Sequence, residues 1–102
     1  MANQMMKYYF WHWNESTGTD IDHWGTSDWY FEIGDDGYVS RQIEVFSSGD
    51  ALYYSDNHIE DKFGGLSEGK FELLDEGEKE ISKSKFERIL TITKFNNVPA
   101  AI

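Results

Sequence analysis

The sequence predicts an α+β fold, in which an antiparallel β-meander of four or five strands packs one face against a single C-terminal helix. Aromatic and β-branched residues alternate with polar ones through residues 28–55, between turn sequences that contain glycine. The segment with the clearest helical spacing of apolar residues comes near the end of the chain, at residues 82–93. A chain of 102 residues can bury one modest core, so we expect a single domain over residues 1–102.

The first expected strand is Lys7–Trp13, KYYFWHW, which is rich in strand-forming aromatics and contains no glycine or proline. It is nearly apolar on both faces. One face or the other must therefore be covered by something besides solvent, so either a helix packs there or part of it is a binding surface. The acidic connection that follows, residues 14–27, is longer than most loops, and long loops in compact domains often carry function.

The turns of the meander predict its register. A three-residue loop, Asp35–Gly37, with Gly37 in the left-handed conformation sets Gly34 opposite Tyr38. The pairs that follow from this loop are Ile33 with Val39, Phe31 with Arg41 and Trp29 with Ile43. A two-residue Ser48-Gly49 turn continues the same apolar face into a third strand, with Val45 opposite Leu52 and Ile43 opposite Tyr54. The face away from the helix is then an aromatic and polar mixture: Tyr30, Tyr38, Ser40, Gln42, Glu44 and Tyr53.

Beyond the meander we expect a short helical turn at 58–63, a short strand at 70–74 and an exposed acidic turn at 75–80. The helix then begins after Ser82 as N-cap, with Ile81 and Phe86 packed together at its start. Its apolar stripe, Phe86, Ile89, Leu90 and Thr93, would lie on the sheet.

Net charge is −10 and the isoelectric point is about 4.5. Such a surface repels nucleic acid and anionic lipid, so neither is an expected partner. No apolar run approaches the ~20 residues that span a bilayer, and there is no cysteine, which together favour a cytoplasmic protein. Phosphate-binding glycine motifs are missing from the sequence, and we expect no cofactor.

Acidic and aromatic residues occur together in two places along the chain, and these are the predicted partner-binding residues. Carboxylates on a rigid surface attract a basic protein, and aromatic side chains supply the contacts that lose water on binding. The first group is Asp20, Asp22, His23 and Trp24; the second is Tyr53, Tyr54, Asp56, Glu60 and Asp61.

Two alternatives stay open. A metal-dependent hydrolase would use Asp20, Asp22 and His23 together with Asp56, His58 and Glu60, although neither group has the spacing of a zinc helix or a calcium loop, so no metal site is expected. A sheet that binds a small ligand or a glycan would use Trp11, Trp13, Trp24 and Tyr53.

Arg41 falls on the predicted core face, and a buried guanidinium must be paired. We expect it either to stack on Phe31 and meet Glu72 or Glu87, or to reach out from an edge strand.

Several stretches resemble a family of small acidic bacterial proteins of undefined function. They are Trp29–Ile33, Gly37–Phe46, Gly49, Gly64–Leu66 and Glu80–Glu87, and the resemblance covers about residues 28–90. Some members of that family lie beside polymorphic toxin genes and are regarded as immunity proteins. The resemblance implies an intracellular protein that binds a cognate toxin domain, in our interpretation a basic nuclease, and covers its active-site cleft; it implies no particular oligomeric state.

Overall fold

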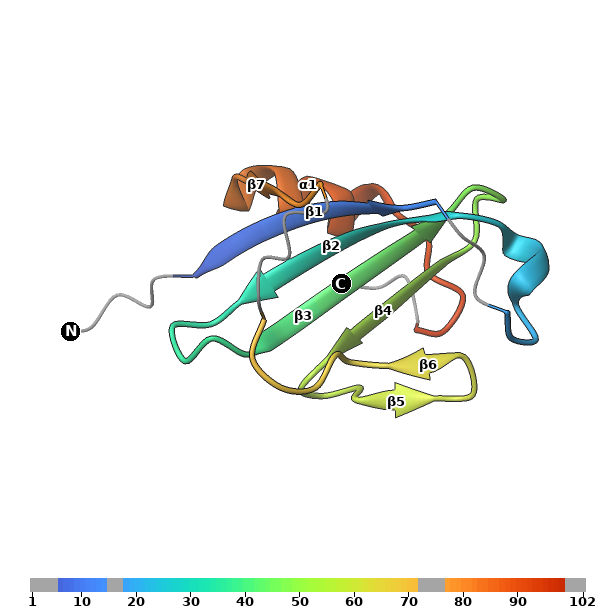
Figure 1. Ribbon diagram of the computed structural model, residues 1–102, viewed down its shortest axis with the longest axis horizontal. Helices are drawn as coiled ribbons and strands as arrows, with labels where there is room; N and C mark the ends of the chain where they lie inside the picture. Colours follow the sequence, from blue (N-terminus) through green and yellow to red (C-terminus); the bar gives the residue numbers. More distant parts are fainter. Residues whose placement is uncertain (1–5, 15–17, 72–76, 99–102) are drawn as a thin grey trace.

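The computed structural model describes residues 6–14, 18–71 and 77–98. A five-stranded antiparallel sheet has the order β4-β3-β2-β1-β7, and helix α1 covers one of its faces (Figure 1). The predicted α+β class is confirmed. The elements are β1 (Lys7–Trp13), η1 (Asp22–Trp24), β2 (Ser27–Ile33), β3 (Val39–Phe46), β4 (Ala51–Ser55), β5 (Glu60–Asp61), β6 (Gly64–Gly65), β7 (Lys79–Ile81) and α1 (Lys83–Ile92). Within the described residues, no helix is long and apolar enough to cross a membrane.

The first strand has the predicted bounds, and it lies inside the sheet because β7 pairs with its outer edge. The acidic turn predicted at 75–80 is therefore wrong for Lys79 and Glu80, which belong to β7 and pair with Phe10 and Tyr9. Ile81, the last residue of β7, pairs with Tyr8 and packs against the core. Most of the strand predicted at 70–74 and the start of that turn lie outside the described residues. Lys70 itself forms an isolated bridge with Tyr38.

A β-bulge at Ser40 overturns the predicted register of β2 and β3. The three-residue loop is confirmed: the Gly34 amide donates to the Tyr38 carbonyl at 2.9 Å, Gly37 has φ +87°, and Ile33 pairs with Val39. Beyond the extra residue, however, the partners shift by one, and Glu32 pairs with Arg41, Phe31 with Gln42 and Trp29 with Glu44. Because a one-residue shift turns every following side chain to the other face, Ile43 and Val45 point toward α1 while Trp29 and Phe31 point away.

The second hairpin is also one residue longer than predicted. Its loop is Ser47-Ser48-Gly49, because the Phe46 amide donates to the Asp50 carbonyl at 2.8 Å and Gly49 takes φ +97°. Val45 therefore pairs with Ala51, and Ile43 with Tyr53, not with Leu52 and Tyr54. Tyr30 and Tyr53, predicted on the face away from the helix, lie on the helix side instead.

The main core lies between the sheet and α1. The Ser82 hydroxyl accepts a hydrogen bond from the Lys85 amide at 3.1 Å, which confirms the predicted N-cap. Phe86 and Leu90 are the helix residues buried here, and Ile81 packs against the same cluster. The cluster's buried members are Tyr8, Tyr30, Ile43, Ala51, Phe86, Leu90 and Phe95.

Arg41 enters this layer as a paired cation. Its Nε and Nη2 atoms donate to the two carboxylate oxygens of Glu32 at 2.8 and 2.5 Å, and Nη2 also donates to Glu87 Oε2 at 2.6 Å. Its guanidinium lies 5.0 Å from the centre of the Phe86 ring. The predicted pairing with Glu87 is confirmed, whereas stacking on Phe31 is wrong because the bulge places that ring on the opposite face. Glu32, the closest partner, is aligned with Arg41 by the same bulge.

The second face of the sheet is covered by connections. Residues 18–26, the β5–β6 hairpin and residues 66–71 pack over it through two smaller clusters. The helical turn predicted at 58–63 is wrong, because Glu60 and Asp61 pair with Gly65 and Gly64 as a small hairpin. A tertiary contact explains the difference: the Asp61 carboxylate accepts hydrogen bonds from the Tyr54 hydroxyl at 2.8 Å and the Phe63 amide at 2.9 Å, which hold the segment extended.

Two asparagines after α1 occupy the outer edge of β4. Asn97 Oδ1 accepts from the Tyr53 amide at 3.0 Å, and Asn97 Nδ2 donates to the Tyr53 carbonyl at 2.9 Å and to Asp61 Oδ2 at 2.9 Å. Asn96 Oδ1 accepts from the Ala51 amide at 3.0 Å, and the backbone amide of Asn96 donates to the Ala51 carbonyl at 2.7 Å. Amide side chains thus take the place of a neighbouring strand and blunt an edge that could pair with another chain.

Replacing Asn97 with alanine is expected to lower the free energy of unfolding by about 2 kcal/mol, because two backbone groups of Tyr53 lose their partner and Asp61 Oδ2 keeps only its contact with His58. Chemical denaturation measures the change. Asn57→Ala, at an exposed turn, is the matched control and should leave stability within about 0.5 kcal/mol of wild type. Equal stabilities for the two variants would contradict the edge role of Asn97.

Candidate functional site

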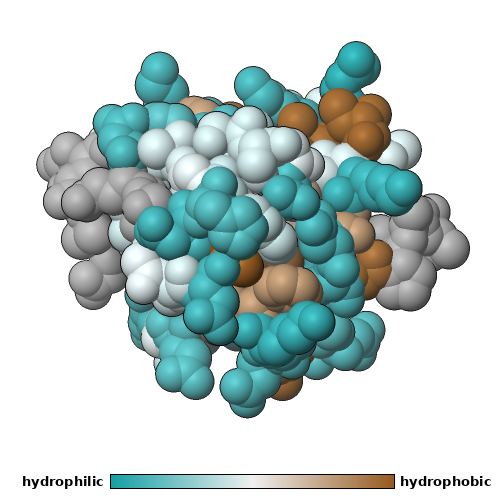
Figure 2. All heavy atoms as spheres, turned by 90° about the vertical axis from the view of Figure 1, so that its right-hand side faces the viewer, coloured by the Kyte–Doolittle hydropathy of each residue, from teal (hydrophilic) through white to brown (hydrophobic). Residues whose placement is uncertain are grey.

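One end of the sheet gathers most of the acidic residues predicted to bind a partner. In Figure 1 this is the right-hand end, where η1 and the β3–β4 and β5–β6 turns lie close together. Figure 2 looks onto this end, and hydrophilic and intermediate residues make up most of its coloured surface. A hollow of about 420 Å³ opens between two segments, residues 19–21 and residues 60–64. It is lined by Thr19, Asp20, Ile21, Glu60, Asp61, Lys62, Phe63 and Gly64.

The first segment is held against the sheet by two apolar side chains. Ile21 is buried, and the Trp24 ring packs edge-on against Phe46 with centroids 5.1 Å apart and lies 5.5 Å from the Phe63 ring. Backbone hydrogen bonds from Asp22 to Thr19 and from Trp24 to Ile21, both 2.9 Å, close the single helical turn of η1. Anchored in this way, Asp20, Asp22 and His23 point away from the core and are exposed.

The second segment is fixed by the Asp61 carboxylate. Besides the Tyr54 hydroxyl and the Phe63 amide, it contacts His58 Nε2 at 2.7 Å and Asn97 Nδ2 at 2.9 Å. Burial pushes the pKa of Asp61 up, but the hydrogen bonds from His58, Asn97, Tyr54 and the Phe63 amide outweigh it and hold the pKa well below its usual range. The Asp61 carboxylate is therefore a negative charge whose position is fixed by four hydrogen-bond partners.

The structure divides the predicted partner-binding residues into three groups. Asp20, Asp22, His23, Glu60 and Asp61 lie at this end of the sheet, and all but Asp61 are exposed. Trp24 and Tyr54 belong to the small core beneath them, where Tyr54 is only 1% exposed. Asp56 and Tyr53 lie elsewhere.

The topology of the sheet separates Asp56 and Tyr53 from the other predicted partner-binding residues. Asp56 follows the end of β4, and lines a hollow of about 240 Å³ with Asp35 and Asp36, next to the β2–β3 turn at the opposite end of the sheet. Tyr53 faces α1 and packs on Phe95 at 5.5 Å between ring centroids, as the three-residue β3–β4 loop requires.

Two charged residues at this end of the sheet were missed by sequence reasoning. Lys62 lines the hollow, and Asp50, from the β3–β4 turn, lies within electrostatic range of His23. Hydrogen bonds from Ser48 at 2.6 Å and from Asn96 at 2.8 Å lower the pKa of Asp50. No spacing in the sequence links Asp50 to residues 20–24; only the antiparallel return of β3 brings them together. We call Asp20, Asp22, Asp50, Glu60 and Asp61 the acidic end.

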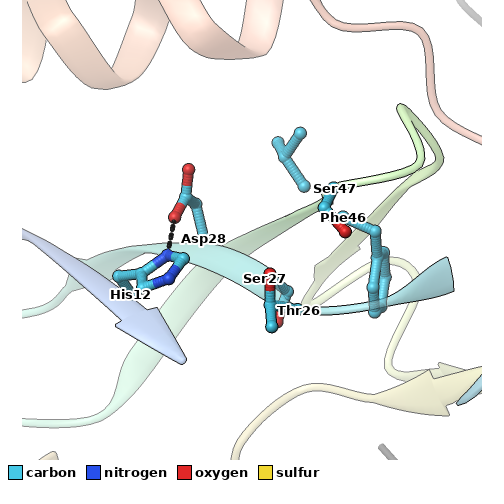
Figure 3. Close-up of a pocket in the computed structure, with 7 residues that line it drawn as sticks. His12, Thr26, Ser27, Asp28, Phe46 and Ser47 are labelled. Carbon is cyan, nitrogen blue, oxygen red and sulfur yellow. Dashed lines mark hydrogen bonds and ion pairs between the residues drawn. The ribbon is translucent and has the colours of Figure 1, made fainter. Parts of the chain in front are cut away.

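A smaller hollow of about 90 Å³ lies beside β1 on the helix side of the sheet (Figure 3). His12 Nδ1 and Asp28 Oδ1 are 2.5 Å apart at its margin, and that contact raises the pKa of His12. The two serine hydroxyls that line it donate elsewhere, Ser27 to Glu44 at 2.8 Å and Ser47 to the Trp24 carbonyl at 3.2 Å. The arrangement is an exposed ion pair, with neither serine hydroxyl directed at His12.

Among residues 6–14, 18–71 and 77–98, no group of three or more His, Asp or Glu side chains is arranged to hold a metal ion. Of the residues considered for a metal site, His58 contacts Asp61 and stacks on the Tyr54 ring at 5.8 Å, and Asp56 lies beside the β2–β3 turn. A scan against models of protein families finds none that matches this chain, and searches of curated proteins and of solved structures find no match either.

Proposed function

We propose that this chain is an intracellular immunity protein, acting in the cytoplasm, whose acidic end binds a cognate toxin domain and covers its active-site cleft. The observation that carries the proposal is the hollow between residues 19–21 and the β5–β6 hairpin, where Asp20, Glu60 and Asp61 line one concave surface. Lys62 is the only cation among the described residues that line it. A lysine or arginine of a partner would find several carboxylates there at once.

Electrostatics support a basic partner. The chain carries a net charge of −10, and its acidic residues outnumber the basic ones by 19 to 9. Such a field accelerates association with a positively charged surface and weakens as salt is added. Asp61, fixed by four hydrogen-bond partners, loses little freedom on binding, which reduces the entropic cost of the contact.

A nuclease is the toxin class that fits this surface best. Its cleft must present lysine and arginine to bind phosphates, so a cluster of carboxylates can occupy the position of the nucleic-acid backbone. Trp24 and Phe63, packed at 5.5 Å beneath the hollow, give the carboxylates a rigid support. Inhibition then follows from competition with the substrate for one basic surface.

Reversing two exposed charges of the acidic end tests the proposal. The protein is first used, at low and at high salt, to capture its partner from the organism of origin, and the recovered domain is assayed for nuclease activity with and without the protein. Asp20→Lys/Glu60→Lys is then expected to weaken binding by at least about 100-fold at low salt, measured by calorimetry, and to abolish inhibition.

The control changes net charge by the same amount at other exposed positions, Asp35→Lys/Glu80→Lys. It should lose far less affinity, because long-range attraction alone changes. Equal losses in the two double variants would show that only net charge matters, and no loss in either would rule out the acidic end as the contact. A captured domain without nuclease activity would refute the toxin class while leaving the binding surface testable.

A further inference from the structure

A chain of aromatic rings runs across the sheet face that α1 does not cover. The rings come from β1, β2 and residue 71, and the centroids of neighbouring rings lie 5.1–6.1 Å apart. Their order along the chain of contacts is Tyr9, Phe71, Phe31, Trp29, Trp13 and Trp11. All of them except Phe31 are half-buried, so each ring still presents part of its surface to water. The sequence suggested Trp11 and Trp13 for glycan binding, but the other two residues named with them, Trp24 and Tyr53, lie in different clusters.

Residues 65–71 form a wall beside these rings. In Figure 1 they belong to the connection that leaves β6 and leads back toward β7. Gln42, buried in the sheet, holds the start of the wall: its Nε2 donates to the Gly65 carbonyl at 3.1 Å, and its Oε1 accepts from the Ser67 amide and hydroxyl at 2.9 and 2.8 Å. The Phe71 amide donates to the Gly37 carbonyl at 2.8 Å and fixes the far end.

The wall and the sheet enclose a groove of about 210 Å³. Its apolar sides are the rings of Trp11, Phe31 and Phe71. Its polar lining residues are two carboxylates, one ammonium group and one hydroxyl: Glu68, Glu78, Lys70 and Ser67. This groove lies on the sheet face beside residues 67–71, and it shares none of its lining residues with the acidic hollow.

We propose that the groove binds a single sugar ring of a neutral carbohydrate. One face of a pyranose ring is made of C–H groups and packs on an aromatic side chain, while its hydroxyls need both acceptors and donors around the edge. Glu68 supplies acceptors, Lys70 supplies donors, and the Ser67 hydroxyl, whose proton is donated to Gln42, supplies a further acceptor. Sites for drug-sized ligands measure about 300–1,000 Å³, so a groove of 210 Å³ suits one ring.

The mixed rim also selects against other ligand classes. A purely apolar ring would remove water from Glu68 and Lys70 without replacing their hydrogen bonds, which opposes binding. A cation would meet the like charge of Lys70 in the rim, and an anion would meet those of Glu68 and Glu78. A neutral ligand with many hydroxyls satisfies both groups, and its binding is insensitive to salt, in contrast with the binding proposed at the acidic end.

The test is a titration of the intact protein with neutral hexoses, 6-deoxyhexoses, pentoses and N-acetylhexosamines. Binding is monitored by protein-observed NMR at low and at high salt. At least one sugar is expected to bind saturably with unchanged affinity at the two salt concentrations, and to shift the signals of Trp11 and Phe71. Trp11→Ala should weaken that binding by about tenfold or more. Trp24→Phe, in the small core at the other side of the same face, is the matched control and should bind as wild type does.

Lys70→Ala keeps the proposal testable if Trp11→Ala proves unfolded by circular dichroism, because Lys70 is exposed and its loss removes a donor without opening the core. It is expected to weaken sugar binding by about threefold to tenfold. The proposal is overturned if no sugar of the panel binds saturably below about 20 mM. It is equally overturned if the bound sugar shifts signals outside the groove, or if a folded Trp11→Ala and Lys70→Ala both bind like wild type.

Discussion

Replacing Arg41 with methionine is expected to lower the free energy of unfolding by about 3–5 kcal/mol, the usual cost of removing one partner from a buried ion pair. Glu32 is only 7% exposed, and without Arg41 it would keep hydrogen bonds from the Tyr8 hydroxyl at 2.8 Å and the Ser40 hydroxyl at 2.7 Å but no opposite charge. Burial pushes the pKa of Glu32 up, and the hydrogen bonds from Arg41, Ser40 and Tyr8 at present bring it below its ordinary value. The variant therefore leaves a buried, uncompensated carboxylate, and urea unfolding at pH 7 measures the loss.

A second variant separates charge from packing. Glu32→Gln/Arg41→Met removes the stranded charge, and we expect it to recover at least about half of the stability lost in the single variant. Lys94→Met, which removes an exposed cation, should change stability by less than about 0.5 kcal/mol. If the single and double variants were equally unstable, the contact of Arg41 with the Phe86 ring, and not the ion pair, would account for the loss.

Replacing Glu44 with glutamine is expected to stabilise the protein by about 3 kcal/mol at pH 8 and to have almost no effect at pH 4.5. Glu44 is 6% exposed and accepts one hydrogen bond from the Ser27 hydroxyl at 2.8 Å. Burial raises its pKa from the ordinary 4.5 to about 7, partly offset by that hydrogen bond. A displacement of this size is equivalent to about 3 kcal/mol between the two protonation states.

The direction follows from proton binding. The folded protein keeps the Glu44 proton up to a higher pH than the unfolded chain does, so the contribution of this carboxyl to stability is fully present below pH 4.5. It is lost as the pH rises through about 7, where the folded protein must also release the proton. Glutamine keeps the acceptor for Ser27 and cannot ionise, which removes the loss.

Denaturant unfolding of wild type and Glu44→Gln at pH 4.5, 6, 7 and 8 checks this expectation, because the difference between the two proteins should grow up to about pH 7 and level off by pH 8. Glu60→Gln, an exposed residue, is the control and should show no such growth. A constant difference across this range would mean that Glu44 does not titrate there. A destabilised glutamine variant at pH 8 would mean that the ionised carboxylate contributes to folding.

Elements with strong local signals could be predicted before the structure was known. Strand-forming aromatics defined Lys7–Trp13 as a strand, and a hydroxyl N-cap followed by apolar residues at helical spacing located α1 after Ser82. The three-residue Asp35–Gly37 loop was also predictable, since only Gly37 in that loop adopts a positive φ without strain. The requirement that a buried Arg41 be paired followed from charge alone, and Glu87 was among its expected partners.

Tertiary structure alone decided which face each strand residue takes and which distant residues meet. The bulge at Ser40 and the extra loop residue Ser47 each shift the strand pairing by one residue. Neither has a strong local signal, because serine is tolerated both in a regular strand and in a bulge or loop. Those two shifts put Tyr53 under α1 and align Glu32 with Arg41. The segment at 58–63 became a hairpin through contacts of Asp61 with Tyr54 and Asn97, which lie 7 and 36 residues away in the chain. A chain folds to satisfy its buried polar groups as well as its local preferences, and those partners are known only once the whole sheet is assembled.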